Sequence, residues 1–140
     1  MKGCVKICQQ FFCNLSLSFD FSFIDACEAG DLETLESLLT STTIDFNQTD
    51  DKGRSGFYHA CYEGHFQVVK LLVQKSKSLN LDLNKADEDG LTAFHTACYA
   101  EHYDIVDFII ANSEEFGINL LAEDDNGETG YDLWPEKSQS

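Results

Sequence analysis

Basic residues and proline are scarce in this sequence, and long hydrophobic runs are absent. The 140 residues include nine Lys and Arg against 25 Asp and Glu, which gives a formal net charge of −16, and a single Pro. An acidic chain is repelled by phosphate backbones and anionic lipid, so neither nucleic acids nor membrane surfaces are expected as partners. No apolar run approaches the roughly 20 residues that a membrane-spanning helix needs. With 43% hydrophobic residues, the composition predicts one acidic, soluble, globular domain.

The chain repeats itself, and glycines mark the repeat. Gly53, Gly90 and Gly127 lie 37 residues apart, and three aromatic residues recur with the same spacing. The surrounding text is similar in three segments: DDKGRSGFYHACYEGH (50–65), DEDGLTAFHTACYAEH (87–102) and DDNGETGYDLW (124–134). A shorter copy, FIDACEAGD, precedes them at residues 23–31. Self-similarity at a fixed period predicts an array of stacked units.

Each copy is expected to fold as a polar turn followed by two helices. The tip, rich in Asp and Gly, predicts a tight turn, after which Ser55 or Thr92 can cap a short first helix. Gly64 permits a sharp turn in the second copy, and apolar residues at helical spacing then predict a second helix. A helix pair of this size cannot bury both faces alone, so neighbouring copies must stack.

Two stretches carry a resemblance to a known family. The third copy reads TAFHTAC (92–98), and the second copy contains GHFQVVKLL (64–72). These stretches resemble the ankyrin repeat, whose pattern is T-P-L-H-x-A-A, then Gly-His, then V-V-x-L-L. The resemblance extends over about residues 22–135 and implies an all-α solenoid of helix–turn–helix units with β-hairpin-like tips.

The sequence departs from the family pattern at several positions. Gly56, Ala93 and Gly130 replace its Pro, Tyr58 replaces its His in the second copy, and Glu101 stands where the third copy should have Gly. The spacing of 37 residues exceeds the family's usual length of about 33 by roughly one helical turn. We place the extra turn at the ends of the second helices, in residues 74–80 and 111–117.

The repeat register divides the chain into a leader, a repeat domain and a tail. Residues 1–22 fall outside the repeat and are expected to cap the array or to be disordered. The repeat domain, 23–135, comprises a partial or capping repeat, two full repeats and a truncated repeat, at 23–50, 51–87, 88–124 and 125–135, and residues 136–140 form the tail. The truncated repeat starts a helix that Pro135 is expected to end. An early stop is typical of a terminal capping repeat, although the chain can also be a piece of a longer array.

Neither the cysteines nor the histidines form a pattern typical of catalysis or metal binding. Cys27, Cys61 and Cys98 share one repeat position where the family has a small buried Ala, so we expect them in the core rather than in disulfides. The histidines follow the repeat register, and His95 matches a position with a structural hydrogen-bonding role in the family. The acidic tips lack the ligand spacing of a calcium loop and are interpreted as solvated turn carboxylates. No catalytic residue, cofactor or metal is therefore expected.

The resemblance places a binding surface on the concave side, at the tips and the inner faces of the first helices. Carried over position by position, this surface comprises Asp51, Lys52, Arg54, Tyr62, Glu63, Glu88, Asp89, Leu91, Tyr99, Ala100, Asp125, Asn126 and Glu128, with Glu28 and Ala29 from the first copy. Tyr62 and Tyr99 are expected to be exposed one repeat apart, and tyrosines commonly anchor a partner protein. The surrounding carboxylates predict a basic partner segment with apolar or aromatic side chains.

The sequence thus predicts a non-catalytic, monomeric module that binds another protein, as an adaptor or inhibitor in the cytoplasm or nucleus. Two other hypotheses stay open. The chain can be a structural fragment of a longer ankyrin array without a complete binding surface, or an enzyme or metal protein, against which the histidine register argues. The two tyrosines can also be half-buried residues on a solvated helix face.

Overall fold

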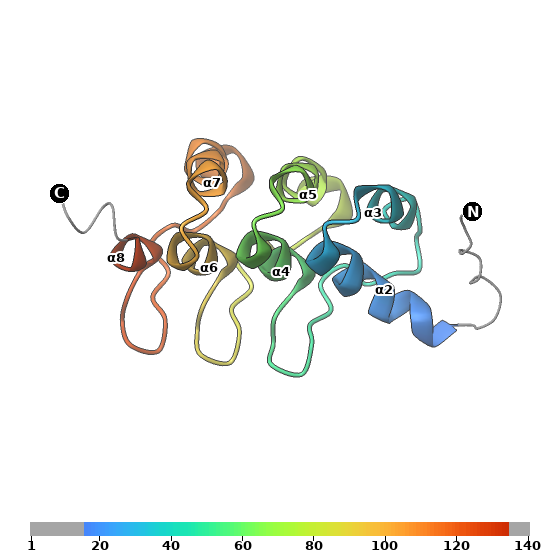
Figure 1. The fold of residues 1–140 in the computed structure, drawn as a ribbon, viewed down its shortest axis with the longest axis horizontal. Helices are drawn as coiled ribbons and strands as arrows, with labels where there is room; N and C mark the ends of the chain where they lie inside the picture. The colour runs from blue at the N-terminus through green and yellow to red at the C-terminus, as the bar shows by residue number, and fades with distance from the viewer. Residues whose placement is uncertain (1–15, 135–140) are drawn as a thin grey trace.

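The computed structural model describes residues 16–134, with side chains from Phe23 onward, and that part of the chain forms two rows of helices (Figure 1). The helices are α2 (Ser16–Ala29), α3 (Leu32–Leu38), α4 (Gly56–Glu63), α5 (Phe66–Leu79), α6 (Ala93–Tyr99), α7 (Tyr103–Phe116) and α8 (Gly130–Leu133). In one row α2 packs on α4, α4 on α6 and α6 on α8, and the other row contains α3, α5 and α7. The loops that enter the first helices project as tips. This arrangement confirms the predicted all-α solenoid.

The first helices begin at the predicted caps. The Ser55 hydroxyl accepts a hydrogen bond from the backbone N–H of Tyr58 at 3.2 Å, and Thr92 caps α6 in the same way. At its other end α4 stops at Gly64, whose φ of 82° is a left-handed conformation that glycine adopts without strain. The turn within this unit therefore forms where the sequence predicts it. In the third unit the non-glycine Glu101 takes a similar conformation, with φ of 63°.

The second helices contain the extra turn that the repeat length requires. Both α5 and α7 have 14 residues, ending at Leu79 and Phe116, so the additional turn lies in the predicted segments. The helix α3 of the first unit has 7 residues and stops earlier. One face of α5 and α7 is buried in the core, as the apolar spacing predicts.

The three cysteines that share a repeat position lie in the core, as predicted. Cys27, Cys61 and Cys98 are free and fully buried. Burial raises the pKa of Cys27 and of Cys98 to about 12, and it also raises the pKa of Cys61. Because the thiolate is disfavoured, these side chains act as small apolar groups.

Phe94 and Tyr131 extend the core to α8, with ring centroids 5.4 Å apart in an edge-to-face pair.

Asparagine side chains tie the loops of neighbouring units together. The Asn47 amide donates to the carbonyl of Asn80 at 2.9 Å and accepts from the N–H of Asp82 at 2.7 Å. Asn84 makes the same two contacts one unit later, on residues 117–119. Each amide thereby satisfies one backbone donor and one backbone acceptor in the loop of the following unit.

The first aspartate of each tip forms the turn. Asp50, Asp87 and Asp124 each use Oδ1 to accept two backbone N–H bonds at 2.9–3.0 Å. These carboxylates are only partly exposed, so they shape the tips and are not freely solvated as the sequence interpretation had them. Adjacent tips are joined by backbone as well, because the N–H of Glu88 donates to the carbonyl of Lys52 at 3.1 Å.

The first repeat extends further towards the N-terminus than its sequence copy. Because α2 begins at Ser16, it crosses the expected boundary between residues 22 and 23, and this part of the leader is continuous with the first unit. The first unit also contains both helices of a pair, α2 and α3. The expectations for residues 1–15, for Pro135 and for the tail 136–140 lie outside the described residues.

Candidate functional site

A groove opens between α4, α6 and α8, on the side where the tips project. Its volume is about 260 Å³. Its walls come from α4, α6, the tips that enter α6 and α8, and the end of α8, and we call it the tyrosine groove. Its lining residues are Tyr58, Tyr62, Leu91, His95, Thr96, Tyr99, Asp124, Asn126, Glu128 and Leu133.

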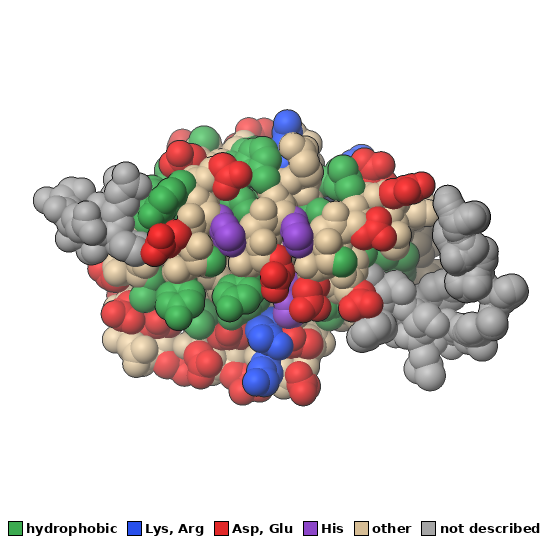
Figure 2. All heavy atoms as spheres, viewed as in Figure 1, with side chains coloured by type: hydrophobic (Ala, Val, Ile, Leu, Met, Phe, Trp, Pro, Cys, Tyr) green, Lys and Arg blue, Asp and Glu red, His purple; other side chains and the backbone are tan. Residues whose placement is uncertain are grey.

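Acidic side chains surround an apolar band on the face shown in Figure 2. Hydrophobic side chains lie between the helices and the tips, while acidic side chains border them, with one cluster of Lys and Arg among the tips. Within the tyrosine groove, the apolar surface of Tyr62, Leu91, Tyr99 and Leu133 lies beside the polar groups of residues 124–128. A ligand in the groove therefore meets apolar surface and negative charge together.

Tyr62 and Tyr99 present large side chains to solvent. Tyr62 is 46% exposed at the end of α4, and Tyr99 is 67% exposed at the end of α6. Both exposures were predicted from the repeat register and are confirmed. Because α4 packs directly on α6, the two tyrosines lie one unit apart in the same groove.

The groove brings together part of the surface that the sequence predicts. It contains Tyr62, Leu91, Tyr99, Asn126 and Glu128. The other predicted residues lie outside it at exposed or partly exposed positions of the tips and helix ends: Asp51, Lys52, Arg54, Glu63, Glu88, Asp89, Ala100 and Asp125, with Glu28 and Ala29 in the first unit. The groove is thus smaller than the predicted surface and lies towards the C-terminal units.

Five lining residues were missed by the sequence reasoning. These are Tyr58, His95, Thr96, Asp124 and Leu133, of which the first three are mostly buried residues of α4 and α6. One signal was available, because Tyr58 replaces a histidine of the family pattern and a phenol reaches further than an imidazole. Leu133 lines the groove because α8 packs against α6, a contact that is evident only in the fold.

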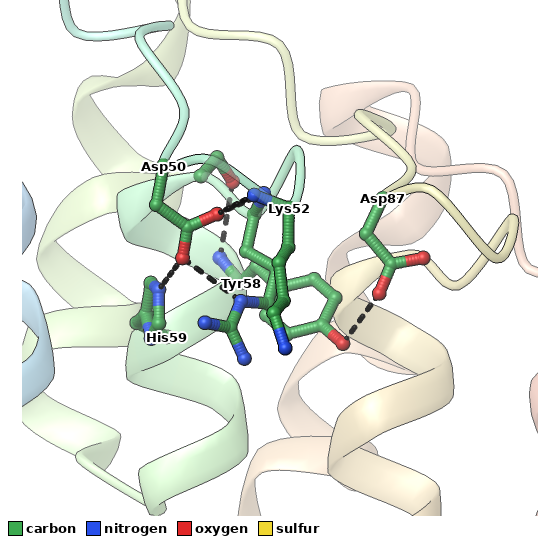
Figure 3. A network of polar contacts seen from close by, with 7 residues as sticks. Asp50, Lys52, Tyr58, His59 and Asp87 are labelled. Carbon is green, nitrogen blue, oxygen red and sulfur yellow. Dashed lines mark hydrogen bonds and ion pairs between the residues drawn. The ribbon is translucent and has the colours of Figure 1, made fainter.

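Arg54 and His59 converge on one carboxylate oxygen at the tip of the second unit (Figure 3). Arg54 Nε lies 2.8 Å and His59 Nε2 lies 3.0 Å from Oδ2 of Asp50. Burial acts to raise the pKa of Asp50, but the backbone N–H groups of Arg54 and Lys52, followed by the His59 and Arg54 side chains, lower it to about 2. Arg54 is thereby paired within its own tip, while Lys52 is exposed beside it.

Tyr58 joins α4 to the following tip. Its hydroxyl donates to Oδ2 of Asp87 at 2.8 Å (Figure 3). Burial, and after it the hydrogen bond to this carboxylate, raise the pKa of Tyr58. The phenol therefore keeps its proton and its bond to the tip, and its ring forms a fixed part of the groove wall.

Histidines bond to backbone carbonyls of neighbouring units, and two of these carbonyls belong to residues that line the groove. Nε2 of His102 lies 2.9 Å from the carbonyl oxygen of Tyr62, and His65 makes the corresponding contact one unit earlier. Nε2 of His95 lies 2.8 Å from the carbonyl oxygen of Glu128, while its other nitrogen closes a capping box at the start of α6. The structural role predicted for the histidines is confirmed for these three residues.

Neither a metal site nor a membrane-spanning helix is found in the part of the chain that the structure describes. Among the side chains of residues 23–134, no group of three or more His, Cys, Asp or Glu is arranged to hold a metal ion. Over residues 16–134, none of the helices has the length and apolar character needed to cross a bilayer.

Comparison with known proteins identifies the repeat. A family model described as ankyrin repeats (3 copies) matches residues 23–124. Acyl-CoA-binding domain-containing protein 6 of Rattus norvegicus is 34% identical over 55 residues, which cover 39% of this chain and 20% of that protein. The protein of the same name from Danio rerio is 34% identical over 57 residues, 41% of this chain and 19% of its own. The matched segment thus spans about a fifth of the length of these relatives.

Proposed function

Because the chain belongs to the ankyrin repeat family, whose repeats are generally protein–protein interaction modules, we propose that it binds a partner protein through the tyrosine groove. The family is typically non-catalytic, and we propose no reaction for this chain. The partner segment is basic and carries apolar or aromatic side chains. The protein acts as an adaptor or as an inhibitor that masks such a segment, as a monomer in the cytoplasm or nucleus.

The observation that carries this proposal is the pair of exposed tyrosines in one groove. Tyr62 and Tyr99 are among the few large hydrophobic side chains exposed in residues 23–134, and they line the same cavity. A tyrosine offers a large contact area with only two side-chain torsions to order, and tyrosines are enriched among residues that dominate binding energy. The two rings therefore supply the apolar centre of the interface.

Charge supplies the selectivity. Asp124 and Glu128 line the groove, and the flanking tips add Glu88, Asp89 and Asp125 at exposed positions. Complementary charge speeds association and rejects acidic competitors, whereas buried apolar contact supplies most of the affinity. A segment with Lys or Arg next to Leu, Phe or similar residues satisfies both requirements.

The proposal is tested with a displayed library of unstructured peptides selected on the purified protein. We expect the selected sequences to combine basic with apolar or aromatic residues. Replacing both anchors, Tyr62→Ala with Tyr99→Ala, is expected to weaken the best peptide at least thirtyfold, since truncating one such anchor costs about 2 kcal/mol or more. Affinity is measured by fluorescence anisotropy on variants with matching thermal unfolding curves.

The matched control is Leu121→Ala, which removes an exposed apolar side chain from outside the groove. Leu121 is 70% exposed and does not line the cavity. We expect this variant to bind as the unsubstituted protein does. Equal weakening by Leu121→Ala, or full affinity in the double tyrosine variant, would refute the tyrosine groove as the site. If no peptide is selected at all, the fragment of a longer array becomes the better hypothesis.

A further inference from the structure

The positive charge that the tyrosine groove lacks is present at the start of the same chain. Residues 1–15, MKGCVKICQQFFCNL, contain Lys2 and Lys6, two Phe and several aliphatic side chains, but no Asp or Glu. Residues 16–140 hold all 25 acidic residues and only the other seven of the nine basic ones. The sequence is therefore divided into a basic, apolar segment and a strongly acidic array.

The composition of this segment matches what the groove offers. Tyr62, Leu91 and Tyr99 provide apolar surface, and Asp124 and Glu128 provide negative charge beside it. In the segment, Val5 and Ile7 flank Lys6. Apolar and basic side chains thus alternate over a few residues, as a ligand of this groove requires.

The segment also begins where it can reach the groove. Its last residue precedes Ser16, the start of α2, at the end of the stack and on the side where the tips project (Figure 1). Two helix-packing steps, α2 to α4 and α4 to α6, amount to about 20 Å at roughly 10 Å each. Residues 16–22, which precede the part of α2 packed in the core, add about 10 Å, so the segment must span about 30 Å. Ten extended residues, from Lys6 to Ser16, span up to about 35 Å.

We infer that residues 1–15 fold back along the concave side and occupy the tyrosine groove as an internal ligand that a partner must displace. The inference rests on the proposed function, because it assigns to the same groove a ligand of the same chemistry. Tethering favours this occupant, since a short linker holds it at an effective concentration in the millimolar range. Binding of a partner is then coupled to release of the N-terminal segment.

The cysteines allow the segment to be located in the full chain. Cys27, Cys61 and Cys98 are completely buried, so a thiol-reactive nitroxide is directed to Cys4, Cys8 and Cys13 in the segment. Replacing Cys8 and Cys13 by Ser leaves one label at Cys4. Isotope-labelled, spin-labelled protein is diluted into an excess of unlabelled protein, so that only broadening within one molecule is recorded.

We expect the backbone amide signals of Leu91, Tyr99 and Asn126 to be broadened, while those of Lys70 and Asp107 on α5 and α7 are spared. Reducing the nitroxide restores the signals. Even broadening over all helices, or broadening confined to α5 and α7, would overturn the inference. A second sample mixes spin-labelled protein without isotopes with isotope-labelled protein without the nitroxide. If the groove amides are broadened only in that mixture, the groove holds the segment of a second chain and the inference is overturned.

Charge reversal separates this inference from the proposed function. With a segment that fills the groove for nine-tenths of the time, the apparent affinity of an external ligand is about tenfold weaker than its intrinsic affinity. Lys2→Glu with Lys6→Glu is therefore expected to bind the selected peptide about tenfold more tightly and to lose the groove broadening. The control Lys70→Glu with Lys75→Glu makes the same change in net charge at exposed residues of α5 and should leave both readings unchanged.

Failure of the internal-ligand inference and failure of the proposed function give different results. Tight peptide binding that is equal in the wild type and in Lys2→Glu with Lys6→Glu, with no groove broadening, refutes the internal ligand and leaves the proposed function intact. If neither protein binds any peptide and no broadening appears, both are refuted.

Discussion

Substituting Gly64 tests whether its close contact with His102 stabilises the turn between α4 and α5. Gly64 ends α4 with φ of 82°, and a Cβ placed there would lie 2.6 Å from the His102 ring. That ring holds the carbonyl oxygen of Tyr62 at 2.9 Å. Gly117 provides the matched control, because it ends α7 with φ of 69° but a Cβ there meets nothing within 4 Å.

The two glycines separate backbone strain from steric overlap. Gly117→Ala carries the cost of a left-handed alanine alone, about 1 kcal/mol. Gly64→Ala carries the same cost and also displaces His102, which adds about 1 kcal/mol for the hydrogen bond and about 1–2 kcal/mol for overpacking. We therefore expect a loss of about 3–4 kcal/mol for Gly64→Ala.

Urea unfolding followed by circular dichroism measures both variants. In thermal unfolding of a domain of this size each kcal/mol corresponds to a fall of about 3–5 °C in melting temperature, so the expected falls are about 3–5 °C for Gly117→Ala and about 9–20 °C for Gly64→Ala. If both variants lose the same free energy of unfolding, the histidine contact contributes nothing and the reasoning is refuted.

Three further predictions concern the same stack. Glu101→Gly should stabilise the protein by about 0.5–1 kcal/mol in thermal unfolding, because Glu101 has φ of 63°; a loss would contradict backbone strain there. Asn84→Ala should cost about 1–3 kcal/mol in urea unfolding, since the side chain pairs a carbonyl and an N–H of the next loop. Asp50 has its pKa lowered from 3.8 to about 2, so its stabilising effect is complete above about pH 4 and is lost as the pH falls towards 2. Urea midpoints at several pH values should show a loss of about 1–2 kcal/mol over this range that is absent in Asp50→Asn.

The repeat, its helices and much of its core were predictable because each depends on residues close together in the sequence. A Ser or Thr cap bonds an N–H three residues on, and a glycine in a turn adopts a positive φ without strain. The burial of Cys27, Cys61 and Cys98 followed from their shared register, since equivalent positions in stacked units face the same neighbours. In this chain the caps and turns predicted from neighbouring residues agree with the burial predicted from the repeat register, so the fold could be predicted from the two together.

The residues that were not predictable bond or pack across units. Asn47 and Asn84 recur with the repeat spacing, but a sequence does not reveal that each amide bridges to the loop of the next unit. Leu133 enters the groove only because the short helix α8 packs on α6. The start of α2 at Ser16 was missed because the residues before 23 have no counterpart in the other copies.

The contacts that stack the units also fix the walls of the proposed site, so the groove is already formed without a ligand. His102 and His95 bond to the carbonyl oxygens of Tyr62 and Glu128, which belong to other units. The Tyr58 hydroxyl bonds to the tip that enters α6. Backbone held in this way has little conformational entropy left to lose on binding, and the exposed rings require only a few torsions to be ordered. Affinity in a small groove of this kind therefore depends on the stability of the stack as well as on contacts with the ligand.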